Sequence, residues 1–189
     1  IDMEAFLGSN FPICTPEVMS WCPTGTLAGY WAPEQCETTP SDCAEFLMAS
    51  PTYDTAYFEQ LTHNLGLKVI HGYYTMSDLP TLVKERYNND LPTVFWWWEP
   101  DPIIGIVGAE RISYPDYSYG CDSNNDKDAD DGTLACDYPE TAMLKLGSTR
   151  LPDDAPQGYY FLTQFQISPD SINTMLSLHV DGGGSLDTQ

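Results

Sequence analysis

The chain has 189 residues, 42% of them apolar, and is long enough to bury one hydrophobic core. Its 7 basic and 28 acidic side chains give a net charge of −21 at pH 7, which repels the phosphates of nucleic acids and anionic lipid surfaces. We therefore expect no nucleic-acid partner. No stretch approaches 18 consecutive apolar residues, so we also expect no membrane span. A solvated acidic surface explains this charge as readily as a surface that attracts cations.

Residues 1–50 carry four of the six cysteines and many prolines, which predicts an irregular, disulfide-bridged segment. Its aromatic run includes Tyr30 and Trp31, which we count among the candidate ligand-binding residues. The even number of cysteines favours disulfides over zinc, because there is no CxxC pair and the histidines are scattered. We expect pairing between neighbours: Cys14 with Cys22, Cys36 with Cys43, and Cys121 with Cys136. Disulfides indicate an extracellular or other extracytoplasmic location.

Residues 51–180 show the pattern of an α/β layered domain. Apolar residues at helical spacing predict a helix over 52–65, and Gly66 follows where a left-handed cap belongs. A β-rich stretch over 67–73 precedes a second predicted helix, capped by Ser77 and Asp78. Residues 93–98 form a continuous apolar run, typical of a strand buried on both faces. The order strand, helix, strand indicates a parallel sheet covered by helices.

The remaining elements complete a single predicted domain over 1–189. Residues 103–109 are predicted core and 144–146 a strand. Residues 155–165 are predicted to be helical, with Tyr159 and Leu162 on one side, and a last helix begins at Ser168 with a proline in its first turn. The glycine-rich residues 181–189 are a predicted flexible tail.

The string Val94-Phe95-Trp96-Trp97-Trp98-Glu99-Pro100-Asp101 is the most informative in the sequence. A strand that ends in tryptophan presents aromatic rings at the carboxyl edge of a parallel sheet, where ligands of open α/β sheets bind. Tryptophan faces attract cations, quaternary ammonium groups above all. Strand alternation would place Trp96 and Trp98 on one face and Trp97 on the other, so at least one of the three is expected to be core.

The stretch 52–105, with Pro92 to Pro100 at its centre, resembles the glycine-betaine-type substrate-binding proteins of ABC importers. The run from Ala155 through Ile172-Asn173-Thr174-Met175-Leu176 also resembles the last part of that family. The resemblance implies a type II periplasmic-binding fold, of which this chain holds mainly the second lobe, with an aromatic site for a small quaternary-ammonium ligand.

Asp101 departs from the family pattern, which usually has His or an aromatic residue after the Trp-x-Pro motif. A carboxylate there repels the acid group of a betaine and favours an ammonium, so we expect a cation without an acid group. The cysteine-rich start and the insert between Cys121 and Cys136 also differ from the bacterial importers. They suggest an elaborated extracellular relative.

The insert between Cys121 and Cys136 alternates oxygen-bearing side chains, as calcium loops do. The candidate ligands are Asp122, Asn124, Asp126, Asp128 and Asp130. The match to an EF-hand is imperfect, because the glycine falls one position late and Asp137 stands where the loop has glutamate. A solvated acidic loop is the alternative, and calcium is the one cofactor that the sequence suggests.

No catalytic residue emerges. Gly183-Gly184-Ser185 lacks the closing glycine of a nucleophile elbow, and carboxylate pairs arise by composition in so acidic a chain. We therefore expect a non-catalytic extracellular domain that binds a small cation through Trp96 and Trp98, with Asp101 as charged partner. The alternative is a structural or adhesive module of an extracellular assembly, in which the fold contacts neighbouring protein domains and ligand binding is lost.

Overall fold

A computed structural model describes residues 29–53, 56–122, 132–139 and 144–181. These residues fall into two compact units, which we describe separately. The first comprises Ile1–Trp98 with Glu110–Tyr138, and the second Glu99–Ala109 with Pro139–Gln189. The single domain over 1–189 stays a prediction. Cys14 and Cys22 lie outside the described residues, as does the predicted tail beyond Asp181.

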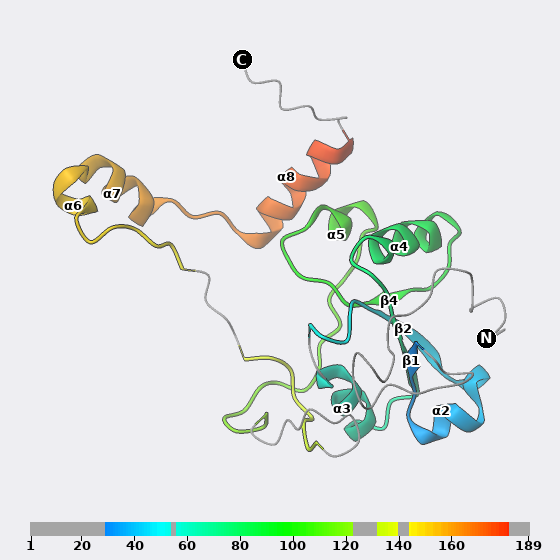
Figure 1. The fold of residues 1–189 in the computed structure, drawn as a ribbon. Helices are drawn as coiled ribbons and strands as arrows, with labels where there is room; N and C mark the ends of the chain where they lie inside the picture. Colours follow the sequence, from blue (N-terminus) through cyan, green and yellow to red (C-terminus); the bar gives the residue numbers. More distant parts are fainter. Residues whose placement is uncertain (1–28, 54–55, 123–131, 140–143, 182–189) are drawn as a thin grey trace. The chain divides into compact units, whose positions relative to one another are not determined.

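The first unit is built on a four-stranded sheet with the order β1-β3-β2-β4 (Figure 1). The strands are β1 (Tyr30–Trp31), β2 (Ala44–Met48), β3 (Val69–Tyr73) and β4 (Val94–Phe95). Strand β2 pairs in parallel with β3 and β4, and β1 pairs antiparallel with β3, with Trp31 opposite His71. The predicted parallel crossover between β3 and β4 is therefore confirmed, and β2 lies between them.

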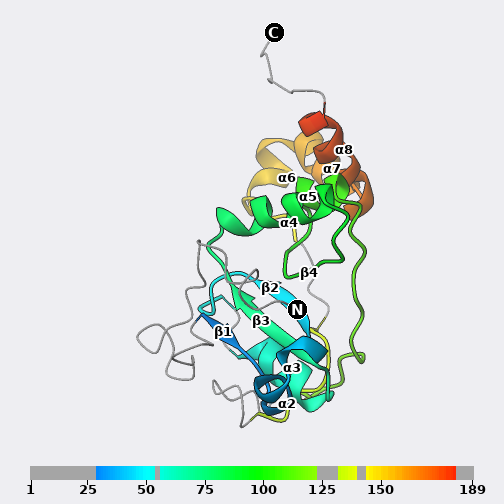
Figure 2. The same ribbon diagram turned by 90° about the vertical axis from the view of Figure 1, so that its right-hand side faces the viewer.

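Helices α3 (Tyr57–Asn64) and α4 (Asp78–Asn88) cover opposite faces of this sheet. Phe46 of β2 packs with Phe58 of α3 in the main hydrophobic cluster, whereas the neighbouring Glu45 pairs with Arg86 of α4. Consecutive strand residues point to opposite faces, so the two helices must lie on different sides. Figure 2 shows both helices with the sheet between them. Both helices were predicted, although α3 begins later than expected.

Strand β2 was missed by the sequence analysis, which treated residues 1–50 as irregular. Ala44–Met48 is one of the two inner strands of the sheet, and four of its five residues are buried. Before it lie the short helix α2 (Glu34–Thr38) and the 3-10 turn η2 (Pro40–Asp42), which the disulfide between Cys36 and Cys43 ties to the start of the strand. The predicted neighbour pairing is confirmed here.

The Cys121–Cys136 disulfide is also confirmed, and the segment around Cys136 packs against α3. Tyr57 donates a hydrogen bond to the carbonyl of Cys136 at 3.1 Å, and its ring stacks on Tyr138 with centroids 4.0 Å apart. Asn64 of α3 donates to the carbonyl of Leu134, which is fully buried. These contacts make the end of the insert part of the core.

Strand β4 is shorter and less buried than predicted. Only Val94 and Phe95 have strand geometry, and both are half-buried. The apolar run over 93–98 indicated a strand buried on both faces, but among the described residues β4 pairs only with β2 and forms the edge of the sheet. An edge strand lacks a neighbour on one side, so its side chains retain access to solvent.

The second unit contains α5 (Pro102–Ile106), α6 (Leu151–Asp154), α7 (Pro156–Gln164) and α8 (Pro169–Asp181). Helices α5 and α8 pack closely: a Cβ on Gly105 would lie 1.7 Å from Oγ of Ser177. Helices α7 and α8 confirm their predictions. The strand predicted over 144–146 is wrong, because this stretch is exposed and has no regular secondary structure. Tyr159 and Leu162, predicted to lie on one side of α7, are both exposed.

Candidate functional site

A hollow lies at the carboxyl ends of the parallel strands in the first unit. It is lined by residues that end or follow β2, β3 and β4: Met48, Ala49, Ser50, Pro51, Tyr53, Tyr73 and Trp96. Strand β2 is followed by α3 on one face and β3 by α4 on the other, so the chain changes direction here. Open α/β sheets bind ligands at such switch points, outside the carboxyl ends of the strands.

The hollow is small and open. Its volume is about 190 Å³, including space continuous with solvent. Most of this space is open to solvent, so the hollow is a shallow depression and not an enclosed pocket. A ligand there would be contacted from one side and would stay partly solvated.

Aromatic rings gather at and beside the hollow. The ring of Tyr53 lies 6.0 Å from that of Trp96, which in turn lies 5.5 Å from Trp98 in an edge arrangement. Trp97 stacks on Trp98 with centroids 4.6 Å apart and an interplanar angle of 9°. Tyr53 and Trp98 are 58% and 45% exposed, so both keep ring surface accessible to a ligand, although Trp97 covers one face of Trp98.

The tryptophan run departs from the expected alternation. Trp96 continues the pairing of β4, because its backbone N–H donates to the carbonyl of Leu47 at 2.8 Å, but regular strand geometry ends at Phe95. Trp97 and Trp98 then stack on one another instead of pointing to opposite faces. Trp96 and Trp97 are partly buried and Trp98 is exposed. Trp96 packs against the main hydrophobic cluster, in line with the expectation that at least one of the three belongs to the core. The three rings form one partly exposed aromatic cluster.

The other predicted ligand-binding residues lie elsewhere. Tyr30 and Trp31 are buried in β1, and neither lines the hollow. The ring of Trp31 packs against His71 of the neighbouring strand, with centroids 5.3 Å apart. Asp101 belongs to the second unit, where its carboxylate caps α5 by accepting a hydrogen bond from the N–H of Ile103 at 2.9 Å.

Tyr53 and Tyr73 were missed as site residues. Tyr73 ends β3, which the sequence did predict, so its place at the carboxyl edge could have been inferred. Tyr53 was assigned to the predicted helix by its spacing. In the structure it lies in the turn after β2, where its N–H donates to the carbonyl of Ser50 at 3.0 Å. Its place at the carboxyl end of a strand could not be inferred because β2 itself was missed.

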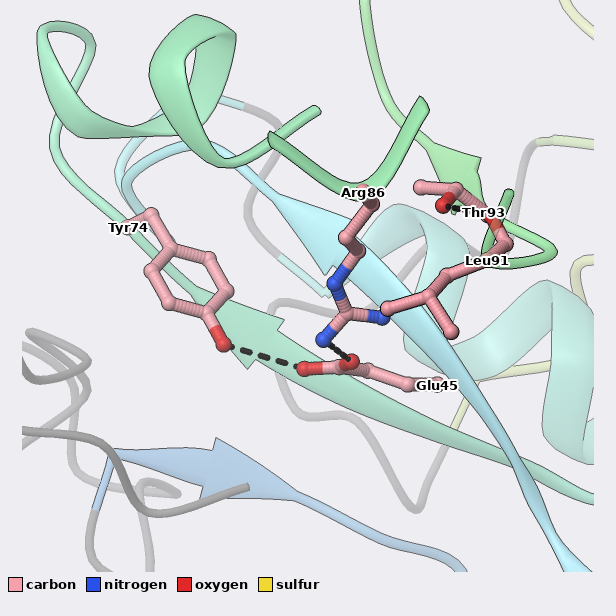
Figure 3. Close-up of polar contacts among 5 residues, drawn as sticks. All are labelled: Glu45, Tyr74, Arg86, Leu91 and Thr93. Carbon is pink, nitrogen blue, oxygen red and sulfur yellow. Dashed lines mark hydrogen bonds and ion pairs between the residues drawn. The ribbon is translucent and has the colours of Figure 1, made fainter. Parts of the chain in front are cut away.

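A largely buried charged cluster of Glu45 and Arg86 fixes α4 on one face of the sheet. Figure 3 shows Arg86 reaching from α4 to the carboxylate of Glu45, which also accepts a hydrogen bond from the hydroxyl of Tyr74 at 3.0 Å. Burial raises the pKa of the Glu45 carboxyl, although the Arg86 guanidinium opposes this. Burial and the nearby Glu45 likewise raise the pKa of Tyr74. A pair of this kind costs much to break from one side, so it holds α4 in place.

The turn after α4 leads directly to β4 and hence to the tryptophans. In Figure 3 the hydroxyl of Thr93 donates to the carbonyl of Leu91, at 2.8 Å. This bond closes the turn from which Val94 enters the sheet. The cluster of Glu45 and Arg86 therefore positions the aromatic residues through α4 and this turn.

The calcium candidates are not brought together by the described residues. Asn124, Asp126, Asp128 and Asp130 lie outside them, and Asp122 accepts a weak hydrogen bond from Tyr117 at 3.4 Å. Within the described ranges no group of three or more His, Cys, Asp or Glu side chains could hold a metal ion. The calcium site stays a prediction.

A mostly parallel sheet with helices on both faces and a hollow at the carboxyl ends of its parallel strands is consistent with one lobe of a periplasmic-binding protein. The sequence model of one family, described as the substrate binding domain of ABC-type glycine betaine transport systems, matches residues 43–187. The chain belongs to this family, as the resemblance predicted. The search of curated proteins found no similar sequence. None of the helices in the described part of the chain is long and apolar enough to cross a membrane.

Proposed function

We propose that the chain is a non-catalytic, extracytoplasmic domain that binds a small cation at the aromatic hollow of its first unit. The family supports a substrate-binding role, and the accessible rings of Tyr53, Trp96 and Trp98 carry the proposal. The face of an aromatic ring attracts a cation, with about 0.5–2 kcal/mol gained per contact. The two disulfides among the described residues support an oxidising compartment.

The charge of the chain favours a cation over a zwitterion. A net charge of −21 raises the local concentration of cations around the protein and lowers that of carboxylates. The role of Asp101, which caps α5 of the second unit, stays a prediction of the sequence. We therefore expect choline and polyamines to bind more tightly than glycine betaine, with dissociation constants from millimolar to high micromolar.

The test is a titration of tryptophan fluorescence with choline, glycine betaine and spermidine. We expect Trp98→Ala to abolish the quenching, and Tyr53→Ala to weaken binding by roughly 2- to 30-fold, which corresponds to the loss of one cation–π contact. Tyr87→Ala is the matched control, because Tyr87 is a similarly exposed tyrosine on α4 that does not line the hollow. Its binding should equal that of the unmodified chain.

Flat titrations across the panel, with circular dichroism confirming the fold, would contradict the proposal. That result would favour the structural or adhesive module.

A further inference from the structure

Tyr74 lies directly behind the wall of the hollow, on the opposite face of the sheet. Its neighbour Tyr73 ends β3, lines the hollow and belongs to the main hydrophobic cluster that β2 and β3 share with α3. The side chain of Tyr74 points instead to Glu45, on the face that α4 covers (Figure 3). Adjacent residues of an extended chain point to opposite faces, so the direction of Tyr74 also sets that of Tyr73.

Tyr74 is held at both its backbone and its hydroxyl. Its N–H donates to the carbonyl of Met48 at 2.9 Å, which extends the pairing of β3 with β2 by one residue beyond Tyr73. Its hydroxyl donates to Oε1 of Glu45 at 3.0 Å. Arg86 pairs with the other oxygen of the same carboxylate, so the two contacts do not compete. Tyr74 therefore ties the carboxyl ends of both strands to a fixed charge within the sheet.

Gly72 leaves the space that this hydrogen bond needs. A Cβ on Gly72 would lie 3.2 Å from Oε1 of Glu45 and 3.2 Å from the ring of Tyr74. It would also lie 3.0 Å from the ring of Tyr30, so the neighbouring groups would have to move. Tyr30, Glu45 and Tyr74 are all buried, and a buried carboxylate oxygen that loses its donor is not compensated by water. The bond between Tyr74 and Glu45 is thus a close-packed part of the first unit.

The two strand ends that Tyr74 joins supply two walls of the hollow. Met48 ends β2 and Tyr73 ends β3, and the two residues are partners in the parallel pairing. The end of β4 is held separately, by the N–H of Trp96 on the carbonyl of Leu47. Without the contact to Glu45, the rung between Tyr74 and Met48 would depend on its backbone bond.

We propose that Tyr74 is a positioning residue for the hollow, because its bonds to Met48 and Glu45 hold Met48 and Tyr73 in the arrangement that a ligand meets. The inference rests on the proposed function and deepens it, since it identifies what sets the shape of the same site. Tyr74 itself does not line the hollow. The attraction between a cation and an aromatic ring depends on their placement, so a displaced wall lowers the affinity although no ligand contact is removed.

Tyr74→Phe tests the proposal, because it removes the hydroxyl and keeps the ring. We expect the dissociation constant for choline, measured by tryptophan fluorescence, to rise roughly 3- to 10-fold, as for residues that act on a site without touching its ligand. Gly72→Ala perturbs the same hydrogen bond while keeping both of its partners, and it should also weaken binding. Circular dichroism checks that both variants fold.

Thr62→Val is the matched control, because it removes another buried hydroxyl, which lies 2.8 Å from Nε2 of His71. Thr62 belongs to α3, which covers the other face of the sheet, and it does not line the hollow. We expect its urea midpoint to fall while its affinity for choline stays that of the unmodified chain. This separates a positioning role from a general loss of stability.

A second measurement reports the wall without any ligand. The chain has six methionines, and with ¹³C-labelled methyl groups the Met48 resonance can be assigned by its disappearance in Met48→Leu. We expect this resonance to shift in Tyr74→Phe and in Gly72→Ala and to stay in place in Thr62→Val. A resonance that does not move in Tyr74→Phe overturns the positioning role, whatever the affinity.

The titrations distinguish failure of the inference from failure of the proposed function. An unmodified chain that does not bind choline contradicts the proposed function, and the inference falls with it. An unmodified chain that binds choline, with Tyr74→Phe binding equally well, overturns the inference alone. Equal weakening in Tyr74→Phe and Thr62→Val overturns it as well, because the effect would then follow from stability.

Discussion

His71 of β3 should make the stability of the first unit fall steeply in mild acid. The imidazole is fully buried between the rings of Trp31 and Phe46, and its Nε2 lies 2.8 Å from the hydroxyl of Thr62. Burial lowers the pKa of His71 from 6.5 to about 3, because the aromatic surroundings cannot solvate an imidazolium. The side chain is therefore neutral in the folded protein throughout the range from pH 7 to pH 4.

The size of the effect follows from this pKa. Below pH 6.5 the histidine of the unfolded chain takes up a proton that the folded chain refuses, so each further pH unit lowers the free energy of unfolding by about 1.4 kcal/mol. At pH 4.5 the loss amounts to about 3 kcal/mol, and it continues until the pH reaches the folded-state pKa. The contribution is fully present above pH 6.5. For a domain of ordinary stability it is a large fraction of the total.

Urea unfolding followed by circular dichroism at pH 7.5 and pH 4.5 measures this loss. We expect His71→Gln, which does not titrate, to lose about 3 kcal/mol less on acidification than the unmodified chain. His63→Gln is the control, because His63 is an exposed histidine on the adjacent α3 and lies outside the aromatic surroundings of His71. Other acidic groups, Glu45 among them, contribute equally to all three proteins and cancel in the comparison. An equal loss in His71→Gln and the unmodified chain would refute the reasoning.

Three further predictions concern the second unit and the insert. Gly105→Ala should destabilise the packing of α5 on α8 by about 1–3 kcal/mol. Ser177→Gly in the same chain should restore much of this loss, because it removes the side-chain atoms that the new Cβ would meet. Thermal unfolding of the single and double variants measures both effects. Replacing Cys121 and Cys136 together by serine should cost about 3 kcal/mol in urea unfolding, because the bridge closes a long loop, and an unchanged midpoint would contradict this. If the acidic loop between these cysteines binds calcium, calcium at a hundredfold excess over its dissociation constant should raise the free energy of unfolding by about 2.7 kcal/mol. Equal thermal midpoints in calcium and in sodium of matched ionic strength would show that the loop is only a solvated acidic loop.

The sequence predicted the elements whose signals are local. Helix α4 has a proline in its first turn and its apolar side chains on one face, and β3 is rich in β-branched residues. Strand β2 could not be recognised in this way, because Glu45, Leu47 and Met48 belong to residue types that favour helices. It is a strand because β3 and β4 pair with it on both sides, and its Glu45 is compensated by Arg86, 41 residues away. Neither the two pairing strands nor Arg86 can be recognised from the sequence around β2.

The candidate site, like the fold, was predicted from the sequence only where its signals are local. Trp96 and Trp98 were placed at the carboxyl edge of the sheet by the motif itself. Their real arrangement depends on β4 being an edge strand that ends at Phe95, and this follows from the strand order, which no local pattern reveals. Tyr53 could be assigned to the site only after β2 was known to precede it.

Because β2 is paired on both sides, its length is constrained during evolution, whereas the length of the turn that follows it is not. One inserted residue within β2 would shift its register against β3 and β4 at once and would exchange Phe46 with Glu45 between the two faces. The turn at 49–53, directly after the strand, has no such double constraint, and changes of length or composition there alter the wall of the hollow without disturbing the ladder. Divergence in ligand preference among relatives of this chain should therefore concentrate in that turn, with β2 itself retaining its length.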